Sequence, residues 1–544
     1  DADALNAYVR SKKPPYMVPA VTTQLDAIPT TSNGKVDQRK LPKPAQVAIK
    51  TGLEPENDTE SAFCEIFENV LHLDKVYADD DFFQIGGASI SAVQALVKAK
   101  VAGFSITYKN LFDNPTPRLL AVFVQQRKTT DVFAPSGAEK EKYDYSALEY
   151  NAPANLDAIG NAGVGDVLLT GVTSFLGSYV FKELLTTTDG AVVCVVRKKN
   201  GRAAKERFET IMKRRFGTWF QESFYKRVAV VEGELGDPDV DKKLAAYRFD
   251  TIVNCAGNFR RYVKGDASVE DNFGGVEPLV RLAEKTGAKL VQASSLSVAG
   301  ESVDGNVPLD FKFAENCLNV GQALPNKYVY SKYLAEQAII DATSRGKIRG
   351  KIIRLGNLTA REEDGEFQVN ASTSAFVKQM LGYRKLGCYP VDMMDAELEF
   401  SPIDYAAKAF VLLAGTPDEF TVFHAQNCHK VHYGYFVNAM NKLGLHVSII
   451  DKDAFVERFK SALQDANDAA AFTGLVAYLA RVDAADAGQD AKKEEYQLRV
   501  RIGSDTSYTT KALYRLGFAW PLTHPEYLDK MVKLLAEIEY FKTN

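Results

Sequence analysis

The sequence lacks long hydrophobic runs, an excess of basic residues and paired cysteines. Its longest apolar stretches, such as 409–414, fall far short of the roughly 20 residues that a membrane-spanning helix needs, so we expect no membrane partner. Lysine and arginine together number 66 and aspartate and glutamate 70, which argues against a nucleic-acid partner. The six cysteines are spread singly, without a CxxC pair, and this predicts a reduced, cytoplasmic protein.

The chain has 544 residues, which suggests about three or four domains. It starts with Asp and shows no signal-like segment, so we expect it to be a piece of a longer protein. Proline, glycine and acidic residues without a sustained period predict linkers at 42–58 and from about 128 to 165. The parts that we expect are a terminal segment 1–44, a small domain 55–128, a linker 129–165, and two larger parts, 166–365 and 366–544.

The small domain is predicted to be helical and acidic. Apolar residues recur at helical spacing over 61–71 and 90–101. Residues 54–127 hold 11 acidic and 6 basic side chains, a local net charge of −5.

From Asp166 onward, short β-branched runs alternate with helical segments. Such apolar strands predict a parallel sheet covered on both faces, and right-handed crossovers then give a doubly wound α/β fold of the Rossmann type. After about residue 365 the alternation weakens, and we expect a helical, substrate-facing subdomain. The predicted strands are 167–170, 192–196, 228–231, 251–255, 289–293 and 351–355, and the predicted helices are 175–187, 203–215, 275–286 and 328–343.

Ser89 lies in the string DFFQIGGASI, directly after two glycines and at the start of an apolar-periodic helix. The partial positive charge at a helix N-terminus favours a phosphodiester attached to this hydroxyl. The structural alternative is that Ser89 is simply an N-cap.

The string TGVTSFLG follows the first predicted strand and opens a helix, the position of a dinucleotide-binding turn. Gly171 and Gly177 satisfy the demands for a tight turn and for close packing, whereas Ser174 takes the place where a glycine is usual. Arg197 follows the second strand, where NAD binders usually place an acid, so we expect NADPH, with Arg207 as a second partner of its 2′-phosphate. The alternative is a solvated basic patch.

Tyr328 and Lys332 lie four residues apart on a predicted helix and therefore share a face. About two such pairs are expected by chance, and Tyr8 with Lys12 is one of them. Ser295 favours a place in the active site for Tyr328 and Lys332 over a chance match, because Ser295 ends a strand at the sheet edge where active sites of this fold lie. The neighbouring histidines and Cys428 at 424–432 lack convergent metal-ligand spacing, and we predict no metal site.

Three stretches resemble parts of nonribosomal peptide synthetases. Residues 14–44, with Lys35 in NGKVD, resemble the C-terminal end of an adenylation domain, although an exposed lysine in a hairpin turn is the alternative. DxFFxxGGxS resembles a four-helix peptidyl carrier (thiolation) domain, with Ala88 where His or Asp is usual. Residues 166–544 resemble the terminal thioester reductase domain, an extended short-chain dehydrogenase/reductase, through TGVTSFLGSYV, VVRKK, GELGDP, NCAG, SSLSV, YVYSKYLAE and RLGNLTAR.

The resemblance implies that Ser89 carries 4′-phosphopantetheine and that Ser295, Tyr328 and Lys332 are catalytic. The implied partners are a peptidyl thioester, a phosphopantetheinyl transferase, and the upstream adenylation and condensation domains of the same assembly line. The implied NADPH contacts are Gly171, Thr173, Ser174, Phe175, Leu176, Gly177, Arg197, Arg207, Glu234, Leu235, Ala256, Gly257, Asn272, Lys332, Leu355 and Asn357. Glu234 and Leu355 depart from the commoner Asp and Pro of this family.

The expected function is reductive release of the thioester as an aldehyde, or as an alcohol where a second hydride transfer follows. One alternative is the carrier and reductase part of an aminoadipate or carboxylic acid reductase, which starts from a free acid. The other is a non-reducing carrier, docking or cyclising module.

Overall fold

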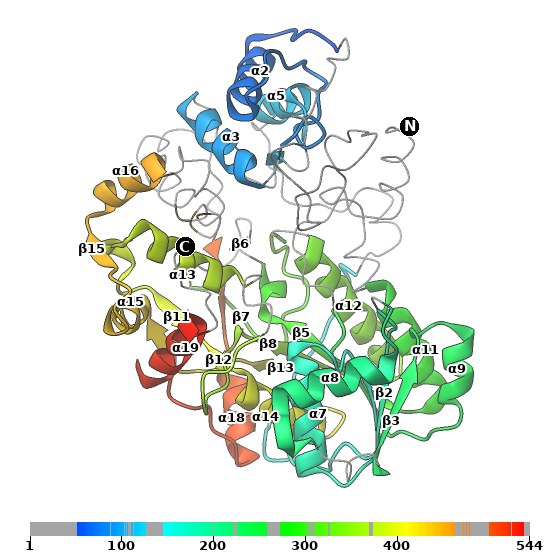
Figure 1. Ribbon diagram of the computed structural model, residues 1–544. Helices are drawn as coiled ribbons and strands as arrows, with labels where there is room; N and C mark the ends of the chain where they lie inside the picture. The colour runs from blue at the N-terminus through cyan, green and yellow to red at the C-terminus, as the bar shows by residue number, and fades with distance from the viewer. Residues whose placement is uncertain are drawn as a thin grey trace, which may run out of the picture. The chain divides into compact units, whose positions relative to one another are not determined.

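The computed structural model places most of the chain beyond residue 51 (Figure 1). The described residues fall into two compact units, one within Asp1–Thr130, Ser372–Pro390 and Ser448–Lys492 and the other within Asp131–Ala371, Val391–Val447 and Lys493–Asn544. None of the helices in the described residues is both long and apolar enough to cross a bilayer. These residues are 52–87, 89–102, 104, 106, 110–111, 114–126, 145–199, 201–220, 226–257, 273–300, 302–303, 308, 310–324, 327–368, 374–462, 472, 475, 478, 500–523 and 525–537.

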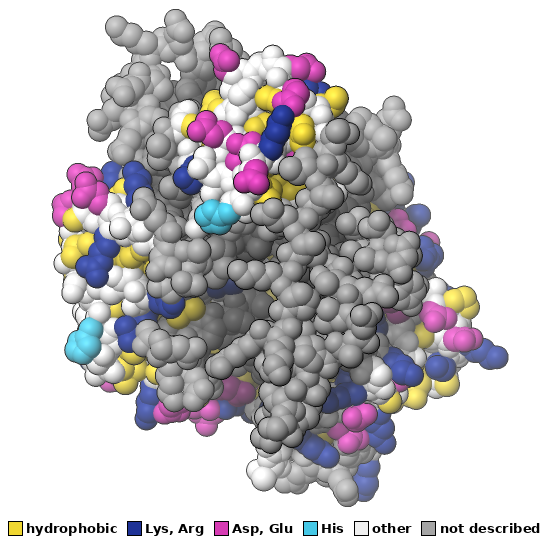
Figure 2. Space-filling model, turned by 45° about the horizontal axis from the view of Figure 1, so that its top comes forward, with side chains coloured by type: hydrophobic (Ala, Val, Ile, Leu, Met, Phe, Trp, Pro, Cys, Tyr) yellow, Lys and Arg dark blue, Asp and Glu magenta, His cyan; other side chains and the backbone are white. Residues whose placement is uncertain are grey.

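The small N-terminal domain is helical, as predicted. The described helices are α2 (Asp58–Leu71), α3 (Ser89–Val101) and α5 (Pro117–Gln126). Phe63, Phe67 and Phe82 are fully buried in a common core, and the Phe67 and Phe82 rings meet edge to face at 4.7 Å. Figure 2 shows more acidic than basic side chains on the visible face of this domain.

The second unit is built on a seven-stranded parallel sheet, which confirms the predicted doubly wound fold. The strand order is β13-β8-β5-β4-β1-β2-β3. Successive strand residues point to opposite faces, so Leu169 and Val253 belong to one core whereas Leu168 and Ile252 belong to the other. The strands are β1 (Val167–Thr170), β2 (Val192–Val196), β3 (Val228–Glu232), β4 (Thr251–Asn254), β5 (Lys289–Ser295), β8 (Arg349–Leu355) and β13 (Val422–Ala425).

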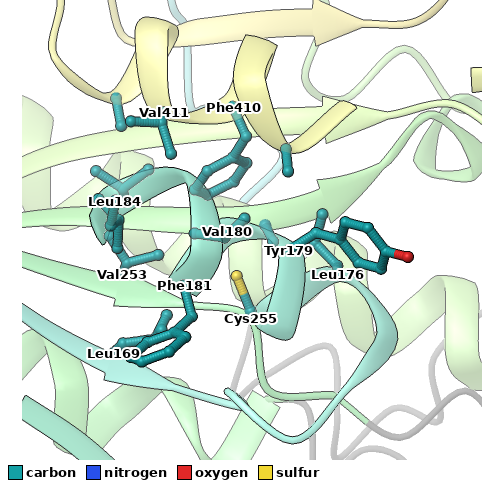
Figure 3. Close-up of a cluster of buried hydrophobic side chains, with 14 of the residues drawn as sticks. Leu169, Leu176, Tyr179, Val180, Phe181, Leu184, Val253, Cys255, Phe410 and Val411 are labelled. Atoms are coloured by element: carbon teal, nitrogen blue, oxygen red, sulfur yellow. The ribbon is translucent and has the colours of Figure 1, made fainter. Parts of the chain in front are cut away.

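Helices cover both faces of this sheet (Figure 1). The first core receives side chains from α7 (Phe175–Thr187), α8 (Ala204–Phe216), α14 (Ile403–Ala414) and α18 (Ser507–Arg515). The second receives them from α9 (Pro238–Leu244), α11 (Val276–Thr286) and α12 (Lys327–Ser344). Figure 3 shows Val180 and Leu184 of α7 packed between the sheet and Phe410 and Val411 of α14.

The sheet crosses the boundary that the sequence predicted at residue 365. Its edge strand β13 pairs with β8, and α14 packs against α7, so residues beyond 365 complete the nucleotide-binding core. The prediction missed β13 because its four residues include a histidine. The remaining elements of this unit include α15 (Tyr433–Lys442) and α19 (Pro525–Glu537), which pack together, and β11 (Glu397–Glu399), which pairs with β14 (Lys430–His432).

Short strand pairs complete the architecture: β6 (Ser302–Val303) with β16 (Val500–Arg501), β7 (Lys312–Phe313) with β17 (Gly503–Ser504), and β9 (Leu358–Thr359) with β12 (Ser401–Pro402). In the first unit, β10 (Cys388–Pro390) pairs with β15 (Ser448–Ile450). Next to them α13 (Ala375–Leu386) and α16 (Lys452–Ala462) share an aromatic cluster, in which Tyr383 contacts Tyr389 and Phe455.

Helix α12 is joined to the sheet by a buried ion pair. The Arg354 side chain on β8 is fully buried and donates through Nε (3.0 Å) and Nη2 (2.8 Å) to Oε2 of Glu336 on α12. The Ser294 hydroxyl on β5 donates to the other carboxylate oxygen. Burial, with the Arg354 charge, lowers the pKa of His424 to about 3, so its neutral imidazole accepts from Arg354 Nη1 (3.0 Å). The helix and three strands therefore share one polar network.

Glu336→Gln is expected to lower the free energy of unfolding by about 3–5 kcal/mol, because it leaves the Arg354 charge buried without a carboxylate. Asp341→Asn on the same helix is the matched control. Its partner Arg345 is exposed, so a loss of at most about 1 kcal/mol is expected. Urea denaturation of both variants measures the difference, and equal losses would contradict an anchoring role for Glu336.

Candidate active site

The turn after β1 requires both of its glycines. Gly171 has φ +73°, and a Cβ there would lie 2.3 Å from the Ala256 nitrogen. A Cβ on Gly177 would lie 2.2 Å from the Gly171 carbonyl oxygen. The ends of β1 and β4 and the start of α7 thus approach each other too closely for any side chain at these two positions.

Ser174 replaces the usual middle glycine because it caps α7. Its Oγ accepts from the Gly177 amide at 3.0 Å, and its hydroxyl donates to the Cys255 carbonyl at 3.4 Å. The first turn of α7 contains no acidic residue. Thr173, Phe175 and Leu176 belong to the same turn, so this N-terminus has the positive partial charge that favours a bound phosphate.

Two arginines gather beyond the end of β2. The Arg207 guanidinium donates to the backbone carbonyl of Arg197, and Arg197 Nη1 lies 3.2 Å from Oε1 of Glu234. Burial and the nearby Arg197 charge both lower the pKa of Arg207. Leu235 packs against the core beside this pair. An anion placed between the two guanidinium groups would relieve their repulsion, so the site fits a 2′-phosphate.

A row of buried polar side chains crosses the carboxyl ends of β1, β4 and β5. Thr170 Oγ1 donates to Asn254 Oδ1 (2.5 Å), and Asn254 Nδ2 donates to Gln292 Oε1 (2.8 Å). Gln292 Nε2 and the Lys332 ammonium both donate to the Ala293 carbonyl, at 2.8 and 3.3 Å.

Asn254 Oδ1 also accepts from the Ala256 amide (3.1 Å), which holds the backbone next to Gly257. Sequence reasoning gave Asn254 and Gln292 no role.

Lys332 and Ser295 lie at the same edge of the sheet as the glycine turn. Burial lowers the pKa of Lys332 to about 8, although Cys255 and Glu336 oppose this shift. Ser295 ends β5, and its Oγ accepts from the amide (3.2 Å) and the hydroxyl (2.9 Å) of Ser297. Tyr328 lies one helical turn before Lys332, in an apolar cluster with Phe273 and 8% exposed. Asn272 falls outside the described residues.

The loop after β8 is held by a carboxylate that the sequence did not reveal. Leu355 is the register partner of Ser295, and the Asn357 amide two residues later donates to Glu399 Oε2 at 2.6 Å. Asn357 Nδ2 also donates to the Glu399 carbonyl (3.3 Å), and the Ser401 hydroxyl donates to Oε1. Burial raises the pKa of Glu399 to about 7. No local pattern joins Glu399 to a loop 42 residues earlier in the chain.

In the small domain, Ser89 is the first residue of α3. Gly86 has φ +114°, and a Cβ on Gly87 would lie 2.3 Å from the Phe82 carbonyl oxygen, which explains why two glycines precede the helix. Ala88 and the N-terminal segment with Lys35 lie outside the described residues.

The histidines near Cys428 do not form a metal site in the structure. No group of three His, Cys, Asp or Glu side chains within the described ranges is arranged to hold a metal ion. His424 instead contacts Arg354 and, through Nδ1, the Asp505 carbonyl (2.6 Å).

Two family models match the chain. Residues 61–124 match the phosphopantetheine attachment site, and residues 169–410 match an NAD-binding family described as male sterility protein. A solved thiolation-reductase di-domain from an archaeal nonribosomal peptide synthetase is 29% identical, with a TM-score of 0.74, and the match covers 91% of this chain and 100% of that one. These similarities support a carrier–reductase fragment of the nonribosomal peptide synthetase type.

Two curated relatives match most of this chain but only a minor part of their own length. A linear gramicidin synthase chain of Brevibacillus parabrevis is 27% identical over 86% of this chain and 9% of its own length. Glycine betaine reductase of Emericella nidulans is 28% identical over 82% of this chain and 36% of its own length. The carrier–reductase fragment thus spans only a minor part of either relative.

Lys332→Met is expected to stabilise the reductase domain at pH 7 by on the order of 3 kcal/mol, because the buried ammonium has a pKa of about 8 when folded and about 10.4 when unfolded. Between these values the unfolded chain binds more protons, so wild-type stability rises with pH and the advantage of the variant shrinks. Urea denaturation at pH 7 and 9.5 measures this trend. Lys347→Met, at an exposed site just after the same helix, should show no such trend, and a pH-independent advantage for Lys332→Met would refute the assignment.

Proposed function

We propose that the chain releases a carrier-bound acyl or peptidyl thioester by reduction with NADPH, and that the product is an aldehyde. The main support is the convergence of the glycine turn, Lys332 and Ser295 at one edge of the sheet. The two arginines beyond β2 support NADPH rather than NADH, because they provide charge for a 2′-phosphate.

The site fits the cofactor, because the glycine turn leaves room that a Cβ would fill. NADPH supplies the hydride when bound. As the hydride reaches the thioester carbonyl, negative charge develops on its oxygen, and Ser295 and Tyr328 are the donors proposed to stabilise it. Tyr328 then gives its proton to that oxygen, and the Lys332 charge favours the resulting phenolate. Collapse of the hemithioacetal releases the aldehyde and leaves the thiol on the carrier arm. A second hydride, from a second NADPH, would carry the product on to an alcohol.

Ser89 is the proposed attachment point of 4′-phosphopantetheine, which requires a phosphopantetheinyl transferase as partner. Upstream adenylation and condensation domains of the same assembly line would supply the thioester. None of the six cysteines forms a disulfide, which supports a cytoplasmic location.

The first alternative is reduction of a free acid that the parent enzyme activates. The relative whose name describes a glycine betaine reductase favours this version, since its named substrate is a small acid. The second alternative, a carrier or cyclising module without reduction, would be favoured by loss of the tyrosine, and the chain retains Tyr328.

Tyr328→Phe should lower the rate of aldehyde release by about a hundredfold or more, because the proton donor is lost, while NADPH binding is retained. The assay loads the phosphopantetheinylated chain with an acyl thioester and follows NADPH absorbance and the mass of the released product. Ser89→Ala should give no loaded carrier and no product.

Faster release of a loaded small acyl group than of a loaded peptidyl group would favour the acid reductase alternative. A cyclic product without NADPH consumption would favour the non-reducing one. Full activity of Tyr328→Phe would refute the proposed proton donor.

Arg197→Ala and Arg207→Ala should each lower the preference for NADPH over NADH by about tenfold or more, because each removes a charged partner of the 2′-phosphate. Steady-state kinetics with both cofactors measures the preference. Lys213→Ala, which removes a charge from the far end of α8, is the control. An unchanged preference in both arginine variants would contradict the assignment of this site.

A further inference from the structure

Arg215 lies in the last turn of α8 and contacts the first turn of α7. Its Nη1 donates to the carbonyls of Ser174 (3.1 Å) and Phe175 (3.0 Å) and to the Ser178 hydroxyl. Its guanidinium carbon lies 5.4 Å from the centre of the Phe175 ring. A single side chain therefore holds the backbone of the turn that follows the Gly171 bend.

The position of this charge is unusual for a purely structural contact. The Ser174 carbonyl already accepts from the Ser178 amide (3.2 Å), so helix formation does not require Arg215. A cation beside a helix N-terminus is repelled by the positive end of the helix dipole. Among the residues that the structure describes, no carboxylate forms a hydrogen-bonded ion pair with Arg215, although the nearby Glu366 charge partly offsets the burial that lowers the pKa of Arg215. The arrangement becomes favourable when an anion binds at this end of α7.

The same turn is also held from its other side. The Tyr179 hydroxyl, which points out of the apolar cluster in Figure 3, donates to Glu366 Oε2 at 3.2 Å. The Arg361 guanidinium lies 3.0 Å from the same carboxylate, and the Phe367 ring meets the Phe175 ring at 5.8 Å. Glu366 is therefore engaged by Tyr179 and Arg361. The turn is fixed between α8 and the segment that follows β9.

We propose that Arg215 is a positioning residue for the cofactor diphosphate, which fixes the backbone at 174–178 and supplies positive charge beside it. The inference rests on the proposed NADPH-dependent function. The diphosphate is common to NADPH and NADH, whereas Arg197 and Arg207 are assigned to the 2′-phosphate, which only NADPH carries. Loss of Arg215 should therefore weaken both cofactors by the same factor, and loss of Arg197 should weaken NADPH alone.

Calorimetric titration of the full 544-residue chain separates these effects. Arg215→Met is expected to raise the Kd of NADPH and of NADH by about tenfold each, and to leave that of adenosine 2′-monophosphate, which lacks the diphosphate, unchanged. Arg214→Met, at the exposed neighbouring position, should leave all three unchanged. Arg197→Ala should weaken NADPH and adenosine 2′-monophosphate and spare NADH.

Arg215→Lys keeps the charge but loses the planar fork, and should raise both cofactor Kd values by a smaller, equal factor. This variant decides the question if Arg215→Met fails to fold. Kd values within twofold of wild type for both cofactors would overturn the role of Arg215. Equal weakening of adenosine 2′-monophosphate would also overturn it, because general loosening of the domain would then be the cause. Failure of the wild-type chain to bind NADPH would instead overturn the proposed function.

Discussion

The contact between the backbones of Gly171 and Ala256 is the constraint on which the site depends. It brings the end of β1 against the end of β4 so closely that no side chain fits, and Gly177 repeats the condition at the start of α7. The same approach places Cys255 and Asn254 beside the turn, where Asn254 begins the polar row that leads to Lys332. The glycine turn and the edge that carries the proposed reactive groups are thus joined by close backbone packing and by hydrogen bonds.

The fold was largely predictable because six of the seven strands contain short runs of apolar, mostly β-branched residues that alternate with helical periodicity. The helix 175–187 agrees with α7 at both ends, and most other predicted elements differ by one or two residues. The strand β13 escaped prediction because His424 interrupts its apolar pattern. That histidine is neutral and bonded to Arg354 and Asp505, partners that are distant in the chain and invisible to a local pattern. The sequence division at 365 failed for the same reason.

The sequence likewise predicts some residues of the candidate site and misses others. Gly171, Ser295 and Lys332 follow from position along strands and helices, since parallel strands end at a common edge. Arg215 and Glu399 do not, because each acts on a backbone segment that lies some 40 residues away. Their side chains are charged and common in type, and only the folded chain shows which carbonyl or amide each one meets.

Helix α12 carries three side chains with proposed roles at intervals of four residues. Tyr328, Lys332 and Glu336 share one face, and Glu336 is tied to the sheet by an ion pair with Arg354. A buried ion pair contributes little net stability compared with apolar packing, but it strongly disfavours any shift of the helix that would separate the charges. Glu336 also favours the charged form of Lys332, against the burial that lowers its pKa. The Glu336 carboxylate therefore fixes the position of α12, which carries the proposed proton donor Tyr328, and it favours the charged form of Lys332. These two effects give the fully buried Arg354 a role, because Arg354 holds Glu336 in place.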